Sequence, residues 1–234
     1  MGNATTPFLS PLGPAKRALD VGLVLLTIPF WLPMLALAAL AARMAMGRPA
    51  LFRQERAGLR GRPFRLVKLR TMTDARGPDG QLLPDEARLT PVGRRLRDWS
   101  LDELPELFNV LRGDMSLVGP RPLPVRYTPR YSPSQARRLL VRPGLTGLAQ
   151  VRGRNLLSWE EKFALDVEYV DAWRLGLDLR ILGWTVLATL SRRGVRPPDR
   201  DTAEEFLGNA TARSAADRRL RTNSGQRPGP ARGK

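Results

Sequence analysis

The sequence predicts a mainly α-helical protein with a small β unit, held on a membrane as a monotopic protein by a re-entrant, proline-broken N-terminal helix. Three observations lead to this fold class. Residues 18–42 are apolar apart from Asp20, and this run exceeds the ~20 residues that cross a bilayer. Pro29 and Pro33 interrupt the run, and each removes a helical hydrogen bond. Later apolar stretches have helical spacing but are too short to span, which is typical of interfacial amphipathic helices.

The composition limits the chemistry that the chain can perform. Its 234 residues carry a formal net charge of +17 and include no His and no Cys. Disulfides and thiolate zinc sites are therefore excluded, and Mg²⁺, which prefers oxygen ligands, is the metal to expect. The basic charge calls for an anionic partner. Because no nucleic-acid-binding module is recognisable and residues 18–42 are apolar, we expect membrane lipid and phosphorylated substrates as partners, and no nucleic acid.

Basic residues stand on both sides of the apolar run. Residues 1–15, rich in proline and small residues, are predicted to be a flexible lead-in. Lys16 and Arg17 then precede the run, and Arg43 and Arg48 follow it. The positive-inside tendency places both flanks in the cytoplasm. We therefore expect the chain to enter and leave the bilayer on one face.

A bend inside the run would satisfy both flanks. We place the break at Pro33, with Pro29 as an additional break, so that residues 16–48 form a re-entrant membrane helix. Two alternatives remain open. A kinked spanning helix also fits, because prolines occur in spanning helices. A signal peptide with the cleavage-like triplet at residues 39–41 fits less well, because the run is longer than the usual apolar core of about 7–15 residues.

The remainder up to residue 194 is predicted to be the cytoplasmic catalytic part, 49–194. It begins with a short β-containing unit at residues 51–72, whose apolar and basic residues partly alternate. Residues 73–87, rich in glycine, proline and aspartate, are typical of a surface loop. Leucines recur at helical spacing over residues 89–111, which predicts a mainly helical stretch.

Loops and two further helices complete the predicted elements. Glycines and prolines favour loops over residues 113–133 and 142–147. Residues 159–173 predict an amphipathic helix with apolar side chains on one face and acids on the other. Residues 179–190 are apolar at most positions but too few to span, so an interfacial or core helix is expected. The basic residues 195–234 have little to bury and are predicted to be a disordered tail.

An adjacent acid pair, Asp102 and Glu103, is the first candidate for chemistry. Ser100 with Glu103 three residues later matches a capping box, Asp102 is itself a good cap, and Pro105 suits a first helical turn. A helix start also offers free N–H groups to a phosphate, and two adjacent carboxylates can border one pocket there. Local evidence therefore leaves two interpretations open, a helix cap and a nucleophile with its helper.

Arg121 is the second candidate, because it stands between Pro120 and Pro122. The fixed φ angles of the two prolines stiffen this loop. A guanidinium held in place is well suited to bidentate contact with a phosphate. The same tripeptide also fits an exposed surface turn.

With these residues the chain resembles the bacterial sugar transferase family, the monotopic phosphoglycosyl transferases that start glycan assembly on a polyprenyl phosphate. The resemblance extends from residue 16 to about residue 194 and depends on the order and spacing of several motifs. These motifs are Lys16-Arg17-Ala18-Leu19-Asp20, residues 52–58, Lys68-Leu69-Arg70-Thr71-Met72, Leu96-Arg97, residues 100–108, residues 113–122, residues 142–147 and Asp166-Val167-Glu168-Tyr169-Val170.

The resemblance implies a mechanism. Asp102 would attack the β-phosphate of a UDP-sugar, form a covalent sugar-phosphate intermediate and release UMP. Glu103 would help deprotonate the acceptor, a polyprenyl (undecaprenyl) phosphate, which then attacks that intermediate. Mg²⁺ would neutralise the diphosphate, with Asp102 as its protein ligand. The family also implies a re-entrant membrane helix, and a location in the bacterial inner membrane with the catalytic part on the cytoplasmic face.

Within this mechanism we assign further residues. Arg97 and Arg121 are the predicted phosphate clamps, and Arg142 with Thr146 are predicted nucleotide contacts. A homodimer is left open as the assembly. The glycan could belong to capsule, lipopolysaccharide or exopolysaccharide, and the extra N-terminal membrane helices of larger relatives are not expected.

Three positions depart from the family pattern. Leu32 precedes Pro33 where Ser is common, Arg174 stands where Ser is usual, and Arg180 replaces a common Lys. The departures leave the acid pair untouched. A rival interpretation is a non-catalytic basic membrane-associated binding protein, in which the acid pair only caps a helix.

Overall fold

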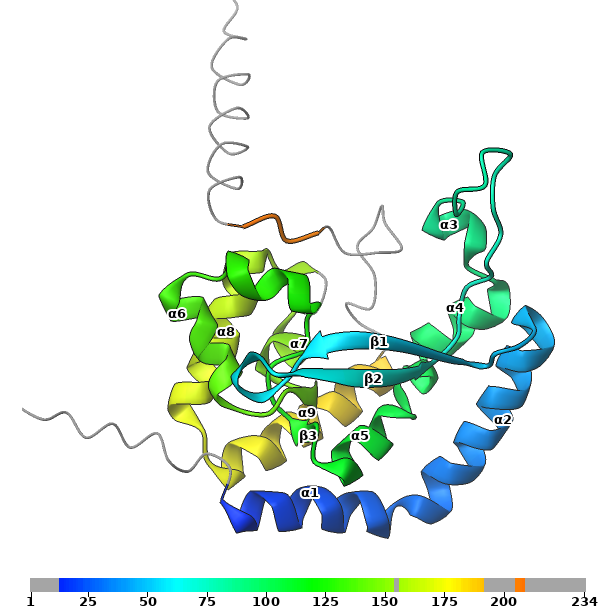
Figure 1. Ribbon diagram of the computed structural model, residues 1–234. Helices are drawn as coiled ribbons and strands as arrows, with labels where there is room; N and C mark the ends of the chain where they lie inside the picture. The colour runs from blue at the N-terminus through cyan, green and yellow to red at the C-terminus, as the bar shows by residue number, and fades with distance from the viewer. Residues whose placement is uncertain (1–12, 154–155, 192–204, 209–234) are drawn as a thin grey trace, which may run out of the picture.

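The computed structural model describes residues 13–153, 156–191 and 205–208, and within them the fold is mostly helical with two small sheets (Figure 1). The α-helices are α1 (Pro14–Leu26), α2 (Ile28–Met46), α3 (Asp85–Arg88), α4 (Pro91–Asp98), α5 (Glu106–Arg112), α6 (Pro133–Ala136), α7 (Leu148–Arg152), α8 (Trp159–Ala172) and α9 (Leu175–Ser191). The 3₁₀ turns are η1 (Leu59–Gly61), η2 (Leu101–Glu103), η3 (Val125–Arg130) and η4 (Arg137–Leu140). The strands are β1 (Leu51–Ala57), β2 (Pro63–Leu69), β3 (Ser116–Val118) and β4 (Gly144–Thr146).

The apolar run forms two helices that meet at an angle at Thr27 (Figure 1). The Thr27 hydroxyl donates to the carbonyl of Leu23 at 2.7 Å, a contact that bends helices. Pro29 lies in the first turn of α2, where its missing N–H has no helical partner to lose. Pro33 lies inside α2, which continues through it. The break predicted at Pro33 is therefore wrong, and the chain turns two residues before Pro29 instead.

Among the described residues, α2 alone is long and apolar enough to cross a membrane. Only 22% of its apolar window is buried inside the protein. Large side chains such as Phe30, Leu37 and Met44 are 70% or more exposed. The outer face of this helix is therefore left uncovered by the part of the chain that the structure describes.

The predicted β unit is confirmed as an antiparallel hairpin of β1 and β2, with Leu51 opposite Leu69 and Ala57 opposite Pro63. The turn holds Gly61 at φ +74, a conformation that glycine adopts without strain. Asn109 of α5 is fully buried and anchors the hairpin, because its Nδ2 donates to the carbonyl of Arg65 and its Oδ1 accepts from the N–H of Val67.

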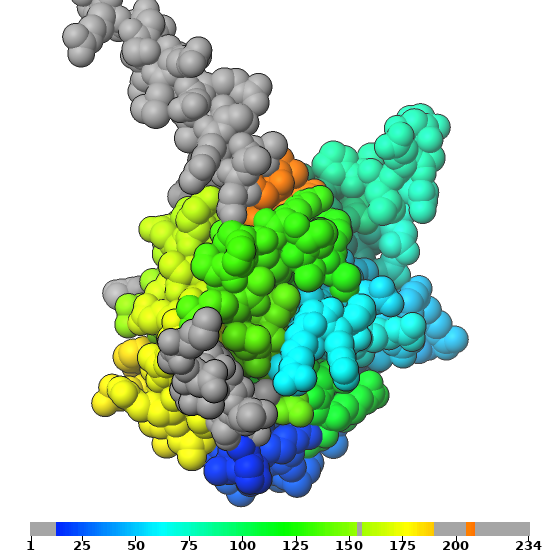
Figure 2. All heavy atoms as spheres, turned by 60° about the vertical axis from the view of Figure 1, so that its left-hand side comes forward, coloured from blue at the N-terminus to red at the C-terminus, as the bar shows by residue number. Residues whose placement is uncertain are grey.

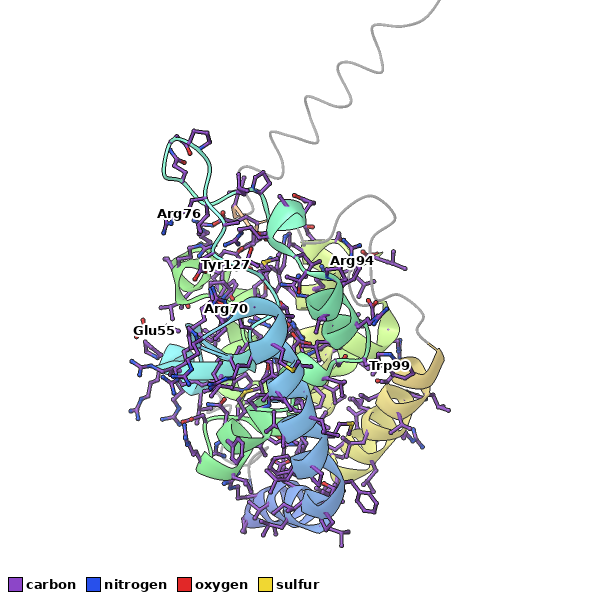
Figure 3. All side chains as sticks on the ribbon, turned by 90° about the vertical axis from the view of Figure 1, so that its right-hand side faces the viewer. Glu55, Arg70, Arg76, Arg94, Trp99 and Tyr127 are labelled. Atoms are coloured by element: carbon purple, nitrogen blue, oxygen red, sulfur yellow. The ribbon has the colours of Figure 1, made fainter. Side chains whose placement is uncertain are left out.

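The predicted helical stretch 89–111 is broken into α4, η2 and α5. Thr90 begins α4 as its cap, accepting from the N–H of Gly93 at 2.9 Å. Ser100 has φ +54, and its side chain forms no cap hydrogen bond, so the capping box predicted with Glu103 is absent. Figure 3, which faces the α2 side of the molecule, shows Trp99 just past the end of α4.

Two segments expected to be loops pair as a parallel sheet. Ser116 of β3 faces Gly144 of β4, and Val118 faces Thr146. A Cβ on Gly144 would lie 2.0 Å from the backbone nitrogen of Gly119. Only glycine permits the two backbones to come this close. The spacing of residues in the sequence did not reveal that these two segments pair.

The amphipathic helix is confirmed as α8, which begins with a capping box between Ser158 and Glu161. Its buried face holds Phe163 and Tyr169, but also Asp166. The prediction that acids occupy the opposite face is therefore wrong for Asp166, whose burial is balanced by Arg138 at 2.7 Å.

Most of the predicted disordered tail, 195–234, lies outside the described residues. Within it, residues 205–208 are described, and the Phe206 side chain is 2% exposed in a small second core with Leu123, Tyr127 and Phe163. The prediction of disorder does not hold for these four residues.

Candidate active site

Asp102 and Glu103 lie in η2, the tight turn between α4 and α5. The left-handed backbone at Ser100 redirects the chain after α4, and Glu103 reaches Lys68 on β2. The N–H groups of Glu103 and Leu104 already bond to carbonyls within the turn. A phosphate here would therefore be held by side chains more than by the helix N-terminus that the sequence suggested.

Glu103 is fixed between two cations. Its Oε1 accepts from Nζ of Lys68 at 2.9 Å and from Nη2 of Arg121 at 2.8 Å. Burial alone would raise the pKa of Glu103, but the charges of Arg121 and Lys68 outweigh it and hold that pKa well below its usual range. Glu103 is therefore ionised and orients both cations.

Asp102 is the less constrained carboxylate of the pair. Its residue is 9% exposed, and among the described residues its carboxylate accepts no hydrogen bond. Burial, and next the charge of Glu103, raise the pKa of Asp102 to about 6, while Lys68, Arg97 and Arg121 act in the opposite direction. A carboxylate with a raised pKa and no hydrogen-bond partner is a better nucleophile than an ordinary surface aspartate.

Arg97 reaches the site from α4 and is oriented by Thr71, whose Oγ1 accepts from Nε at 3.0 Å. The close packing of α4 on this strand end depends on Gly93, because a Cβ there would lie 1.9 Å from the carbonyl oxygen of Thr71. The charge of Arg97 lowers the pKa of Asp102, so the two side chains lie near each other. The role of Arg97 as a phosphate clamp stays a prediction.

The backbone around Arg121 is held by two other arginines. Nη2 of Arg138 donates to the carbonyl of Arg121 at 2.7 Å, and Nη1 of Arg56 donates to the carbonyl of Pro122 at 3.3 Å. The side chain of Arg121 remains about half exposed, at 48%. It is therefore fixed at its base and open to a ligand at its tip.

Sequence reasoning missed two residues of the site, Lys68 and Glu106. Nζ of Lys68 lies 2.9 Å from Oε1 of Glu106 as well as from Oε1 of Glu103. Burial, and next the charge of Glu103, raise the pKa of Glu106 to about 7. Burial lowers the pKa of Lys68, but the two glutamates outweigh it and leave that pKa raised. The signal available was the family motif that begins at Lys68, together with its place at the end of an alternating strand.

The two predicted nucleotide contacts lie in structural interactions. Nε of Arg142 donates to the carbonyl of Gly113 at 2.8 Å. Thr146 is buried, and its hydroxyl lies 2.7 Å from the hydroxyl of Thr185 on α9. The structure thus brings Asp102, Glu103, Arg97 and Arg121 together, whereas the contacts of Arg142 and Thr146 are with other elements.

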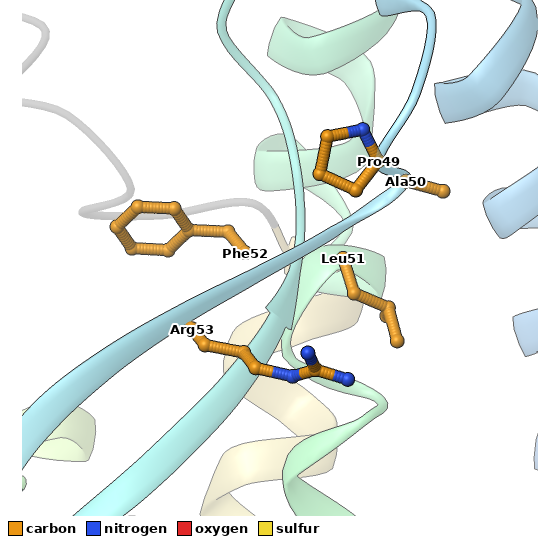
Figure 4. Close-up of a pocket in the computed structure, with 5 residues that line it drawn as sticks. All are labelled: Pro49, Ala50, Leu51, Phe52 and Arg53. Carbon is orange, nitrogen blue, oxygen red and sulfur yellow. The ribbon is translucent and has the colours of Figure 1, made fainter.

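A hollow of about 550 Å³ opens where α2 meets β1, lined by Pro49, Ala50, Leu51, Phe52 and Arg53 (Figure 4). Phe52 pairs with Lys68 in the hairpin, so the two side chains share one face of the ribbon. Figure 4 shows Phe52 pointing away from Leu51 and Arg53. The hollow therefore lies next to β2, the strand that carries Lys68, and directly after the C-terminal end of α2.

The described residues offer a divalent metal little beyond Asp102. They contain no group of three or more acids that could hold a metal ion. Glu103 is already paired with Lys68 and Arg121, which leaves the carboxylate of Asp102 free to bind. A site of this kind fits Mg²⁺ that takes most of its ligands from water and a diphosphate.

The site combines an adjacent carboxylate pair with Arg121 and Arg97, an arrangement that suits an enzyme acting on phosphate-bearing substrates. The chain belongs to the bacterial sugar transferase family, whose model matches residues 12–192. This match confirms the family that the sequence predicted. Because members of the family are transferases, the chain is a transferase, which disfavours the interpretation of a non-catalytic binding protein.

Relatives agree with this assignment. The chain is 55% identical to the sugar transferase EpsL of Bacillus subtilis over 74% of this chain and 85% of that one. It is 48% identical to the UDP-glucose:undecaprenyl-phosphate glucose-1-phosphate transferase of Caulobacter vibrioides over 75% of this chain and 70% of that one. It is 34% identical to the exopolysaccharide production protein ExoY of Rhizobium meliloti over 82% of this chain and 96% of that one.

Proposed function

We propose that this enzyme transfers a sugar 1-phosphate from a UDP-sugar to undecaprenyl phosphate at the cytoplasmic face of the bacterial inner membrane, and so initiates exopolysaccharide or related glycan assembly. The observation that carries the proposal is the carboxylate of Asp102, a buried residue with no hydrogen-bond partner among the described residues. The positive charges of Lys68, Arg97 and Arg121 lie close enough to act on its pKa. The names of the relatives from Caulobacter vibrioides and Klebsiella pneumoniae support a UDP-sugar donor and an undecaprenyl phosphate acceptor.

In the first step, an oxygen of Asp102 attacks the β-phosphorus of the donor. A bond forms between that oxygen and phosphorus, and the bond from phosphorus to the bridging oxygen breaks, so that UMP leaves with the electron pair. Arg97 and Arg121 contact the phosphates and offset their charge. A covalent aspartyl phosphosugar results. Dividing the transfer into two displacements keeps the two anionic substrates from having to react directly.

In the second step, a phosphate oxygen of the acceptor attacks the same phosphorus and releases the carboxylate of Asp102, giving a polyprenyl diphosphate-sugar. Glu103 takes up the acceptor proton. The pKa of Glu103 is held low by Arg121 and Lys68, and phosphates that compete for these cations would raise it toward its usual value. Donor and acceptor phosphates thus make Glu103 a better base when it is needed.

Mg²⁺ would be held by Asp102 together with oxygens of the diphosphate, and when bound it neutralises phosphate charge. The residues of the chain perform the remaining tasks. Lys68 keeps Glu103 in place, and Thr71 orients Arg97.

The acceptor lipid would approach along α2, whose exposed apolar face we propose lies in one leaflet as half of a re-entrant hairpin with α1. The exposed residues Leu51 and Phe52 continue this apolar surface toward the hollow beside β2. On α9, Leu179, Val186 and Leu187 are 55–64% exposed, which suits a helix lying in the interface.

Asp102→Asn tests the proposal, because it preserves shape and removes the nucleophile. With a UDP-sugar and no acceptor, the wild-type enzyme is expected to release UMP up to one equivalent and to gain the mass of a phosphosugar on the peptide that contains Asp102. The variant is expected to show neither. The control Asp79→Asn, in an exposed loop, should behave as wild type. UMP release by Asp102→Asn at the wild-type rate would refute the mechanism, and a panel of UDP-sugars in the same assay identifies the donor.

A further inference from the structure

A pocket of aromatic side chains lies beside the candidate active site and holds a short segment from near the C-terminus. We call it the aromatic pocket; it is formed by Leu123, Tyr127, Tyr131, Trp159 and Phe163. Phe206 fills it and is 2% exposed. Its ring centroid lies 4.9 Å from that of Phe163 in edge contact and 6.0 Å from that of Tyr131 in a stacked arrangement. Figure 2 shows residues 205–208, in orange, seated against the green surface of η3 and α6.

Charged groups at the rim select the residue before the aromatic ring. Oε1 of Glu205 accepts from Nε of Arg126 at 3.1 Å and from Nη1 of Arg130 at 3.1 Å. Arg130 also donates to the carbonyl of Phe206. Leu207, by contrast, is 63% exposed. The pocket therefore holds an acid at its rim, followed by a buried aromatic side chain. Residues 205–208 lie outside the part of the chain that matches the family, 12–192.

The aromatic pocket is connected to Arg121 by Arg138. The guanidinium of Arg138 lies 5.6 Å over the ring of Tyr131 and 5.5 Å over that of Phe163, and both rings also contact Phe206. It is buried, pairs with Asp166, and donates to the carbonyl of Arg121 at 2.7 Å. Removing Phe206 from the pocket would expose the rings of Tyr131 and Phe163 and give the guanidinium of Arg138 more freedom to move. The hydrogen bond from Arg138 to the backbone carbonyl of Arg121 would then be weakened.

We propose that the aromatic pocket is a docking site for the Glu205–Gly208 segment of the same chain, and that Phe206 seated there is a positioning residue which holds Arg121 for the donor phosphate. The positioning role depends on the proposed function of Arg121 as a phosphate clamp. The docking itself does not, so binding and kinetics are measured separately.

Docking is tested with the full-length Phe206→Ala protein and a fluorescent peptide of residues 201–210. The peptide is expected to bind this variant saturably, and at least tenfold more tightly than the wild type, whose own segment occupies the pocket. A peptide with Ala at the Phe206 position should not bind. Leu207→Ala, which shortens an exposed neighbour, should resemble the wild type. Equal peptide binding by Phe206→Ala and wild type would overturn the docking site.

Positioning is tested by kinetics in two backgrounds. Phe206→Ala is expected to lower kcat/KM for the UDP-sugar about tenfold, mainly through KM, and the peptide should restore it. In an Arg121→Lys background the same change should have less than a twofold effect, because the group that it positions has already been altered. A merely structural role would reduce activity equally in both backgrounds, which would refute positioning even where the peptide binds.

A mixing experiment identifies which copy supplies the segment. Asp102→Asn protein cannot turn over under the proposed mechanism but carries an intact segment. It is expected to leave the KM of Phe206→Ala protein unchanged. Recovery of that KM on equimolar mixing would overturn the assignment to the same chain and place the segment on a second copy.

Discussion

Asp102 and Glu103 are neighbours of the same chemical class, yet their surroundings separate their acidities. Burial and the charge of Glu103 raise the pKa of Asp102 to about 6, whereas Arg121 and Lys68 keep Glu103 ionised. Two carboxylates whose pKa values move apart are suited to different tasks. The sequence could show the pair and Arg121, but it could not show this division, because Lys68 reaches Glu103 from another element of the fold.

Glu106 gives a prediction about pH and stability. Its pKa is raised by burial, and next by Glu103, to about 7 in the fold, above the ordinary 4.5. The folded protein then binds this proton more tightly than the unfolded chain, so the free energy of unfolding falls as pH rises from about 4.5 to about 7. Glu106→Gln removes that loss. Between pH 5 and pH 8 the free energy of unfolding of the variant should therefore rise, relative to that of the wild type, by on the order of 2 kcal/mol.

Thermal unfolding of detergent-purified protein across this pH range measures the effect. Glu168→Gln on α8, an exposed glutamate, is the matched control and should show no comparable gain. A Glu106→Gln protein that loses stability relative to wild type as pH rises would contradict the prediction, since it would mean that the ionised form of Glu106 is favoured in the fold.

At the scale of elements, the sequence located most helices but not where they break. The sequence predicted a short β unit from partial alternation, α8 from helical spacing and α9 from a short apolar run, because each of these patterns is local. It misplaced the bend of the apolar run, because Pro33 was a stronger local signal than Thr27. The indole N–H of Trp31 donates to the carbonyl of Val24 across the bend at 3.0 Å, a contact that no periodic pattern encodes. The pairing of β3 with β4 was also missed, because it joins segments far apart in the sequence and leaves no periodic pattern in either.

The position of the bend leads to a prediction about membrane topology. Single cysteines replacing Ala15 and Arg48, both exposed in a chain with no cysteine, mark the two ends of the α1–α2 hairpin. In intact spheroplasts both should be protected from an impermeant thiol reagent and react only after permeabilisation. Adding Pro33→Ala should leave this result unchanged, because the bend lies at Thr27.

A variant that removes the bend completes the experiment. Thr27→Leu combined with Pro29→Ala favours one continuous helix, and the cysteine at position 15 should then become accessible from outside. Labelling of just one site in the otherwise unchanged chain would contradict the re-entrant arrangement and favour the kinked spanning helix.

At the scale of the whole molecule, a buried charge network docks α1 onto the catalytic part. Nζ of Lys16 lies 2.7 Å from Oδ2 of Asp178, which is 1% exposed and also accepts from the indole N–H of Trp173. On the next turn of α1, Asp20 accepts from the N–H of Leu117 in β3. Since β3 leads directly into the loop of Arg121, α1 and Arg121 are joined through one strand. The family motifs around Lys16 and Tyr169, far apart in sequence, meet in this network.

Removing only Lys16 from the buried pair with Asp178 should therefore lower the stability of the fold more than removing both charges of that pair. Lys16→Met leaves the carboxylate of Asp178 buried without its cation, and we expect a loss of about 3 kcal/mol of stability. In Lys16→Met/Asp178→Asn the amide oxygen can accept from Trp173 in the place of Oδ2, and the amide N–H can donate to the Tyr169 hydroxyl in the place of Oδ1, because that hydroxyl can give its own proton to the carbonyl of Val118. No charge is then left buried, so most of that loss should return. Melting temperature in detergent, with UMP release as a second readout, measures both. A double variant less stable than Lys16→Met alone would show that the charge of Asp178 is held by groups other than Lys16, and that docking of α1 does not depend on this pair.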